Sequence, residues 1–243
     1  MAKERYTMIT NLSDYLVGVA VGIRFRANFS LEDQFGKIVD DILYSKHSSF
    51  GPAVFPNVRS AVGGRQLVNE ATGDSMTIDN SNFILEIECG NRCTADDVVP
   101  LVDAFRTQII QGVMKKYGVR EIIRVGYIRK YIFTVGQLAN RFVDKTIGSS
   151  LEGVEDINLS FSKKMPTEDA FSQRDVDDYH NAIFNIIKHA DKDEIFMSVD
   201  FQRMFLPFLP SVNEMKFDPF VSSAESFNKR IYLPWLNTNY VEA

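Results

Sequence analysis

Two short polar turns, each set between runs of β-forming residues, restrict the fold of this chain. The first turn is residues 71–74, where Gly73 can supply the positive φ of a tight turn. The second is residues 191–194, inside the β-rich stretch 181–205. Because a tight turn joins antiparallel neighbours, the sequence predicts an α+β fold. We expect mainly antiparallel sheet, built from hairpins, with interleaved helices packed on one face.

The remaining elements follow from the spacing of apolar residues. Alternation predicts further strands over residues 15–26, 83–89, 121–133 and 155–165. Helical spacing predicts helices over 30–43, 94–118 and 135–147, the second ending at Gly118. Asp218 and Pro219 have the residue types of an N-cap and a first-turn proline, and they predict a last helix from there.

The chain of 243 residues is long enough for one large domain or two small ones. A boundary near residues 148–153 would divide an N-terminal α+β half, 1–148, from a C-terminal hairpin-plus-helix half, 149–243. One continuous domain is the alternative. With 45% hydrophobic and 24% charged residues, the composition is that of a soluble protein with a sizeable core.

Charge and hydropathy exclude some classes of function. A net charge of -5 argues against a general nucleic-acid binder, because phosphate binding requires an excess of Lys and Arg. No apolar run is long enough for a membrane span, and the start of the chain lacks the apolar core of a signal peptide. We therefore expect a cytoplasmic protein without membrane association, in which Cys89 and Cys93 are reduced thiols.

Common catalytic motifs do not occur in the sequence. It contains no P-loop, no dinucleotide-binding glycine pattern and no nucleophile elbow. The three histidines have no metal-site spacing relative to cysteine. No catalytic residue and no cofactor is predicted on these grounds, although an enzyme with a site assembled from scattered residues stays open.

The stretch EIIRVGYIRKYIF, residues 121–133, holds the candidate ligand-binding residues. Alternation places Tyr127 and Arg129 on one face of this strand, and Arg124 and Lys130 on the other. A guanidinium among aromatic residues on a covered sheet needs a carboxylate, a carbonyl or a ligand. One interpretation is therefore a pocket for an anionic or planar ligand. The other is a network of internal ion pairs with carboxylates on neighbouring strands, namely Glu86, Glu88, Asp156 and Asp200.

A second cluster, in the polar segment RDVDDYH, could hold a divalent cation. Its carboxylate and imidazole groups are ligand types for metals. A solvated loop explains the same residues equally well. The candidate metal ligands are Asp175, Asp177, Asp178 and His180.

Three short motifs resemble a sporadically distributed family of uncharacterised bacterial proteins. They are Phe55-Pro56, the strand 83–88 that leads to a long helix, and Arg124-Val125-Gly126. The resemblance covers most of the chain and implies no activity or catalytic residue.

Three functions remain as hypotheses. The first is a non-catalytic binding or assembly protein, with a protein partner or a homo-oligomer, because the aromatic segment 205–220 could lie on another subunit. The same phenylalanines could instead seal the protein's own core. The second is an enzyme or small-anion-binding protein using Arg124, Arg129 and residues 175–180. The third is a local nucleic-acid patch of Lys115, Lys116, Arg120, Arg124 and Lys130.

Overall fold

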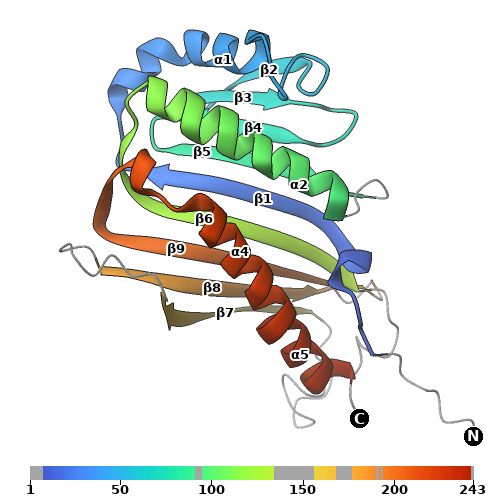
Figure 1. The fold of residues 1–243 in the computed structure, drawn as a ribbon. Coiled ribbons are helices and arrows are strands. Elements are labelled where there is room, and N and C mark those ends of the chain that lie inside the picture. Colours follow the sequence, from blue (N-terminus) through green and yellow to red (C-terminus); the bar gives the residue numbers. More distant parts are fainter. Residues whose placement is uncertain are drawn as a thin grey trace, which may run out of the picture.

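A computed structural model gives the fold of the chain and describes residues 8–90, 95–133, 156–167, 177–189, 192 and 194–241. Its strands form one antiparallel sheet with the order β2-β3-β4-β5-β1-β6-β9-β8-β7 (Figure 1). The strands are β1 (Leu16–Phe25), β2 (Asn57–Ala61), β3 (Gly64–Val68), β4 (Ser75–Asp79), β5 (Asn82–Glu88), β6 (Arg120–Phe133), β7 (Ile157–Pro166), β8 (Asp177–Lys188) and β9 (Ile195–Ser211).

Helices connect and cover these strands. α1 (Phe35–Tyr44) follows β1, and α2 (Ala95–Ala104) continues directly into a π-helical stretch, Phe105–Met114. α4 (Phe217–Phe227) is followed by a π-helical turn, Asn228–Tyr232, and by α5 (Leu233–Leu236). Figure 1 shows α2 lying across the half of the sheet that contains β3 to β5, and α4 across the half that contains β9 and β8, both in front of the strands.

The predicted α+β class with a mainly antiparallel sheet is confirmed. Both predicted hairpins are present, β3 with β4 and β8 with β9, and Gly73 has a φ of 82°. β6, from the N-terminal half, pairs along its length with β9, from the C-terminal half. Strands on both sides of residues 148–153 therefore belong to one sheet. The predicted helix over 135–147 lies outside the described residues.

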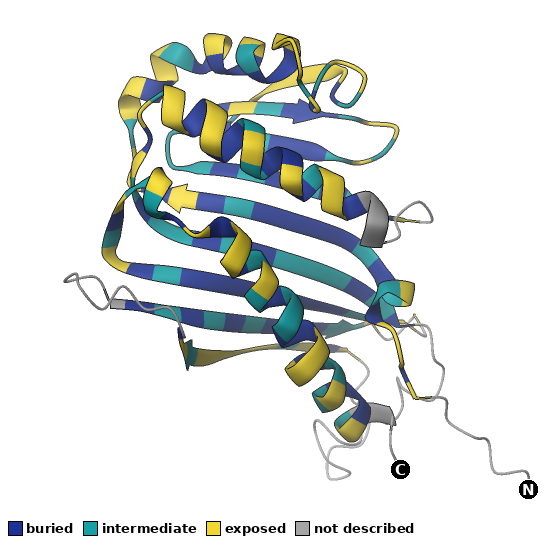
Figure 2. Ribbon diagram, in the orientation of Figure 1, coloured by how far each residue is buried: buried dark blue, intermediate teal, exposed yellow. Residues whose placement is uncertain are grey.

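The two faces of the sheet differ in what covers them. The helix face is packed under α2 and α4 and is lined by buried apolar residues, among them Val19, Val21 and Val125. Figure 2 shows the strands mostly buried and the outer sides of α2 and α4 exposed. The opposite face, called the reverse face below, carries Arg24 on β1 and Arg124 on β6 among smaller side chains. Alternation along each strand thus assigns neighbouring residues of β6 to different environments.

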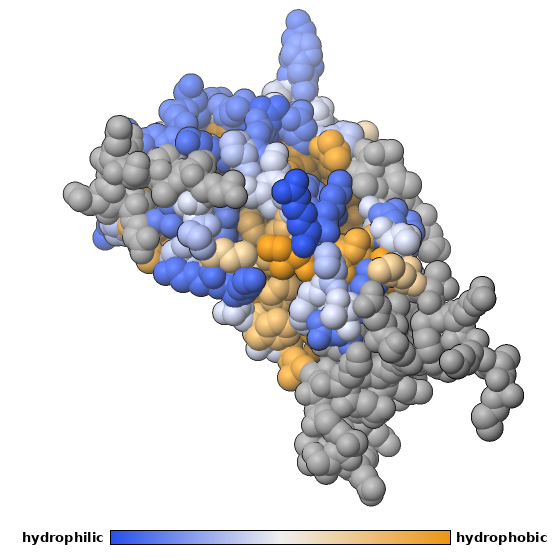
Figure 3. Space-filling view, turned by 60° about the horizontal axis from the view of Figure 1, so that its bottom comes forward, coloured by the Kyte–Doolittle hydropathy of each residue, from blue (hydrophilic) through white to orange (hydrophobic). Residues whose placement is uncertain are grey.

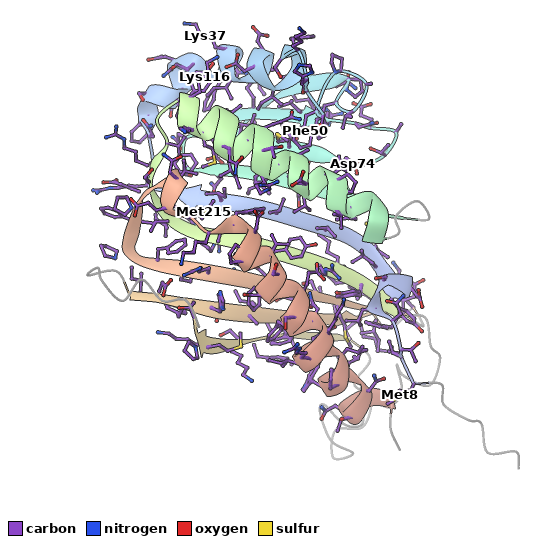
Figure 4. All side chains as sticks on the ribbon, viewed as in Figure 1. Met8, Lys37, Phe50, Asp74, Lys116 and Met215 are labelled. Atoms are coloured by element: carbon purple, nitrogen blue, oxygen red, sulfur yellow. The ribbon has the colours of Figure 1, made fainter. Side chains whose placement is uncertain are left out.

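The end of the π-helical stretch is tied to α1 by a small polar network. Lys116 Nζ lies 2.5 Å from Asp41 Oδ2, and the Tyr117 hydroxyl donates to the same oxygen at 2.7 Å. Lys116 is labelled next to α1 in Figure 4. Burial and this carboxylate raise the pKa of Tyr117 to about 12. Lys116, part of the suggested nucleic-acid patch, is thus already neutralised by a neighbour.

Two local predictions were wrong. α4 begins at Phe217 with Lys216 as its N-cap, so Asp218 is inside the first turn rather than the cap. Its carboxylate stabilises the helix there through the macrodipole. Strict alternation also fails at the start of β6, where register shifts on both sides leave Ile123 as an extra residue. Ile122 is therefore fully buried, although alternation placed it with Arg124.

β7 forms one edge of the sheet. Figure 3, which brings this end forward, shows hydrophobic residues gathered near the middle of the surface, next to hydrophilic ones. Phe161 on β7 is 42% exposed and stacks on Phe184 at 4.9 Å. By contrast, Phe205, Phe217 and Phe220 are buried, so these aromatic side chains seal the core of this chain. None of the described helices has the length and apolar character needed to cross a membrane.

Candidate functional site

A cleft of ≈ 390 Å³ lies on the helix face, between α2 with its π-helical extension on one side and α4 on the other. Its volume is within the range of ligand pockets in proteins. Tyr127 and Arg129 of β6 line it from the sheet. The other lining residues come from the helices: Val99, Val102, Asp103 and Arg106, and Phe217, Asp218, Val221, Ser222, Glu225 and Lys229.

Arg129 is the most constrained charged group of the cleft. Its side chain is 11% exposed and forms an ion pair with Glu225 of α4. Its Nε is buried and has no hydrogen-bond partner among the described residues. Burial alone would lower the pKa of this guanidinium, but Tyr127, Tyr131 and Glu225 around it raise the pKa above its ordinary value. Arg129 is therefore a permanent cation with one donor group left over.

Tyr127 supports this cation from the same face of the strand. It is 3% exposed, and its ring centroid lies 5.6 Å from the Arg129 guanidinium carbon. This is cation–π geometry, which becomes stronger when the pair is shielded from water. Burial raises the pKa of the Tyr127 phenol, so the ring stays neutral at physiological pH.

The walls of the cleft are apolar and its rim is charged. Phe217 packs against Phe105 with ring centroids 6.4 Å apart. This contact joins the start of α4 to the start of the π-helical stretch. At the rim, Arg106 lies between Asp103 and Asp218, with Nε 3.2 Å from Asp218 Oδ1. Arg106 therefore links the π-helical stretch to the start of α4, and it closes that end of the cleft with paired charges.

Local sequence accounts for these positions. The period of two along β6 directs both Tyr127 and Arg129 to the helix face. Val221, Glu225 and Lys229 follow one another at intervals of four and so share one side of the helix. Glu225 was missed by sequence reasoning, which searched for partners only on strands. The sequence does contain an indication of its role, because Glu225 follows Phe217 and Val221 at intervals of four and so lies on the same side of the helix as these apolar residues.

The other two predicted ligand-binding residues lie on the reverse face. Lys130 Nζ is 3.1 Å from Glu88 Oε1 and 3.8 Å from Glu86 Oε1. Gly18 of β1 lies between them, and a Cβ there would be 3.2 Å from Lys130 Cδ. Arg124 faces Asp200, as the electrostatic effect on that carboxyl indicates. The structure thus separates Arg124 and Lys130 from Tyr127 and Arg129, and it realises the internal pairs with Glu86 and Glu88.

The suggested metal ligands have other surroundings where they are described. Asp178 is fully buried and pairs with Arg203, whose Nε donates to it at 3.0 Å, and Thr167 donates to its second oxygen at 2.7 Å. The His180 ring packs against Phe201 in a tilted arrangement, with ring centroids 4.8 Å apart. Asp175 and the side chain of Asp177 are outside the described part of the chain. Within the described part, no group of three such residues is arranged to hold a metal ion.

The cleft can bind a ligand with an apolar body and a hydrogen-bond acceptor. Valine and phenylalanine side chains of the lining would contact the apolar body, and the Arg129 guanidinium would pair with a carbonyl or an oxyanion. The polar groups among the described lining residues are carboxylates, guanidiniums, two hydroxyls and one lysine, and none of these residues is Cys or His. In comparisons with known proteins, no family model matches the chain and no curated protein sequence matches it.

Proposed function

We propose that this chain is a binding protein that takes a small amphipathic molecule into the cleft between α2 and α4. The observation that carries the proposal is the largely buried Arg129 cation, held by one carboxylate, Glu225, at the floor of a ligand-sized cleft. A guanidinium is a strong donor to carbonyl and oxyanion groups, so one that lines a cleft is suited to hold such a group there. The position of the cleft also supports the proposal, because α2 and α4 form its two walls and β6 forms its floor.

The ligand class follows from the lining. Val99, Phe217 and Val221 favour an apolar or aromatic body, and Arg129 favours an acceptor at one end. Because Glu225 already compensates most of the charge of Arg129, the acceptor need carry only a partial or single negative charge. Lys229, one helical turn beyond Glu225, adds a third cation to the lining, after Arg129 and the paired Arg106.

Anilinonaphthalene sulfonate is a suitable first probe, because it combines an aromatic body with one sulfonate. We expect a fluorescence increase that saturates at one dye per chain. Val221→Trp, which fills the cleft, is expected to abolish it, and Arg129→Met to weaken binding about tenfold, through loss of one charged hydrogen bond. Val62→Trp is the matched control, since Val62 is fully exposed outside the cleft.

Thermal unfolding of each variant excludes a loosened core as the source of dye fluorescence. Equal dye binding in all three variants and the natural chain would contradict the proposal. Native mass spectrometry of the purified protein is the independent arm. A retained small molecule that is lost in Val221→Trp supports the cleft, whereas one retained equally by that variant places binding elsewhere.

A second candidate function is assembly with another copy of the chain through β7. Phe161 lies near the middle of this ten-residue edge strand and is 42% exposed. Antiparallel pairing about a two-fold axis near Phe161 would bring the two rings together and keep Lys163 and Lys164 opposite uncharged residues. Light scattering after gel filtration tests it: a dimer that Phe161→Lys dissociates supports the pairing, and a monomer at high concentration contradicts it.

Cytoplasmic location and membership of the bacterial family with the Phe-Pro and Arg-x-Gly motifs also stay proposals. Both rest on the sequence patterns that predicted them.

A further inference from the structure

The reverse face of the sheet contains a hollow of ≈ 60 Å³ where β1 and β6 meet. Gly22 of β1 and Gly126 of β6 are cross-strand partners at this point, so two adjacent strands both lack a side chain. Side chains of the flanking strands lean over them. A Cβ at Gly22 would be 3.1 Å from Ile84 Cγ1, and one at Gly126 would be 3.4 Å from Asp200 Oδ1. The floor is therefore backbone, and the walls come from β5 and β9.

Two arginines stand at one end of this hollow. Arg24 and Arg124 both line it and are directly opposite each other in the ladder. Like charges in that position destabilise a sheet. Within the described part of the chain, neither guanidinium has a carboxylate oxygen within 4.0 Å. Among the described residues that line the hollow, Asp200 is the single acidic one, so the lining has one more basic than acidic group.

We infer that this hollow is a second binding site, independent of the cleft, for a single oxyanion group, a carboxylate or a phosphate. An anion between Arg24 and Arg124 would turn a repulsive pair into two attractive ones. The planar guanidinium fork matches two oxygens of such a group. The glycine floor lets the group approach the backbone closely.

The size of the hollow sets the class of ligand. A water molecule needs roughly 10 to 15 Å³ of such space, so the hollow holds a few waters or one small group. A complete nucleotide or a polypeptide would have to remain outside, with only its acidic group inserted. The walls are consistent with this, since Ile84 and Ile128 provide apolar sides between the two arginines at one end and Asp200, the cross-strand partner of Ile128.

The charge state of Asp200 affects how strongly the hollow attracts an anion. Burial raises the pKa of this carboxyl, against the opposing effects of Gln202, which donates to it, and of the Arg124 charge. Its cross-strand neighbours, Ile128 and Ile183, carry no charge. An ionised Asp200 would compete with the anion for Arg124, so Asp200→Asn should tighten anion binding.

The test is the thermal unfolding midpoint of the full chain at constant ionic strength, with sodium chloride replaced stepwise by sodium phosphate or sodium acetate. Binding to the native state raises the midpoint with the logarithm of anion concentration above the dissociation constant. We expect a rise of a few degrees, with phosphate and acetate as separate arms. A rise with phosphate alone identifies a phosphate site, and a rise with acetate identifies a carboxylate site.

Substitutions test whether the rise in the unfolding midpoint comes from anion binding in the hollow. Arg24→Gln with Arg124→Gln should remove the rise without unfolding the chain, because it also removes a repulsion. Gly126→Ala should reduce it, because a methyl group enters the hollow in ordinary contact with Asp200. Arg26→Gln is the matched control, since Arg26 lies just beyond β1 and pairs with Glu121 at 3.5 Å.

Each outcome decides the matter. A rise that persists in Arg26→Gln and disappears in the double variant supports the site. A rise of equal size in all variants is a general salt effect and overturns it, as does the absence of any rise with either anion. Neither result depends on dye binding to the cleft, so the two sites succeed or fail separately.

Discussion

The two faces of β6 stabilise their positively charged side chains in different ways. On the helix face, Arg129 is 11% exposed and meets a single carboxylate, Glu225, from a helix far along the chain. On the reverse face, the adjacent Lys130 is 24% exposed and shares two glutamates of β5 across a glycine. Burial imposes a dedicated partner, because an isolated charge away from water is prohibitive. Partial exposure allows a looser network and even a like-charge pair, Arg24 with Arg124.

The largest expected effect comes from the deepest charge on the helix face. Asp178 and Arg203 have side chains 0% and 2% exposed. Asp178→Ala removes the carboxylate and leaves a buried guanidinium, so we expect a loss of about 3–5 kcal/mol in the free energy of unfolding. Urea denaturation measures it, with Asp33→Ala, at an exposed position, as the control. A loss below about 1 kcal/mol would contradict the view that this face tolerates charges only in pairs.

Alkaline pH gives the next largest effect. Tyr131 is fully buried on the helix face, and burial raises its pKa from the ordinary 10.0 to about 12. A raised folded-state pKa means that the contribution to stability is complete below pH 10 and is lost as the pH rises through 12. The shift is worth on the order of 2–3 kcal/mol.

Urea denaturation just below pH 10 and near pH 12 should show this loss, and Tyr131→Phe should reduce it. Tyr117→Phe should reduce it too, since its pKa is raised to the same value. Tyr44→Phe, at an exposed position, is the control for removal of a hydroxyl group. An unchanged alkaline loss in Tyr131→Phe would show that this ring does not carry the dependence.

A matched pair of substitutions compares the two faces directly. Arg129→Met and Lys130→Met each remove one cation from adjacent positions of β6 and retain an unbranched apolar chain. We expect about 1–3 kcal/mol for Arg129, whose charged hydrogen bond is largely shielded from water. We expect about 0–1 kcal/mol for Lys130, whose partners are 42% and 45% exposed. Chemical denaturation measures both, and equal losses would mean that burial does not set the value of these pairs.

Sequence patterns were sufficient for most of the elements and their antiparallel pairing, although β2 was not predicted. The glycine of the first turn and the polar second turn limit strand direction, and alternation along β6 correctly separates Arg129 from Lys130. These are local properties, since turn geometry and a period of two depend only on nearby residues. The extra residue at Ile123 escaped prediction because a bulge arises from the pairing of three strands.

The candidate sites could be predicted only in part. Tyr127, Arg129 and Arg124 were identified as residue types that need partners. Glu225 and Asp200 were harder to assign, because the packing angle of α4 and the strand order decide which carboxylate meets which cation. The neighbouring position of Arg24 and Arg124 likewise requires the order β5-β1-β6, which no single segment specifies. The strand order of the sheet and the packing of α4 on it therefore could not be predicted from local sequence patterns.

The smallest expected effect has the opposite sign and concerns the thin part of the reverse face. Gly126 lies in mid-strand, outside the left-handed region, and a Cβ there would be 3.4 Å from Asp200 Oδ1, an ordinary contact. Gly126→Ala should therefore raise the free energy of unfolding by about 0.4–1 kcal/mol, because the unfolded chain loses freedom. Gly64→Ala is the contrast, since its Cβ would be 2.1 Å from the Ile78 carbonyl oxygen, and it should destabilise the protein.

Stabilisation by Gly126→Ala together with weaker phosphate or acetate binding would mean that the glycine is kept for access to the hollow. Destabilisation would mean that the strands need that space for packing, and the reverse face would then be as tightly constrained as the helix face.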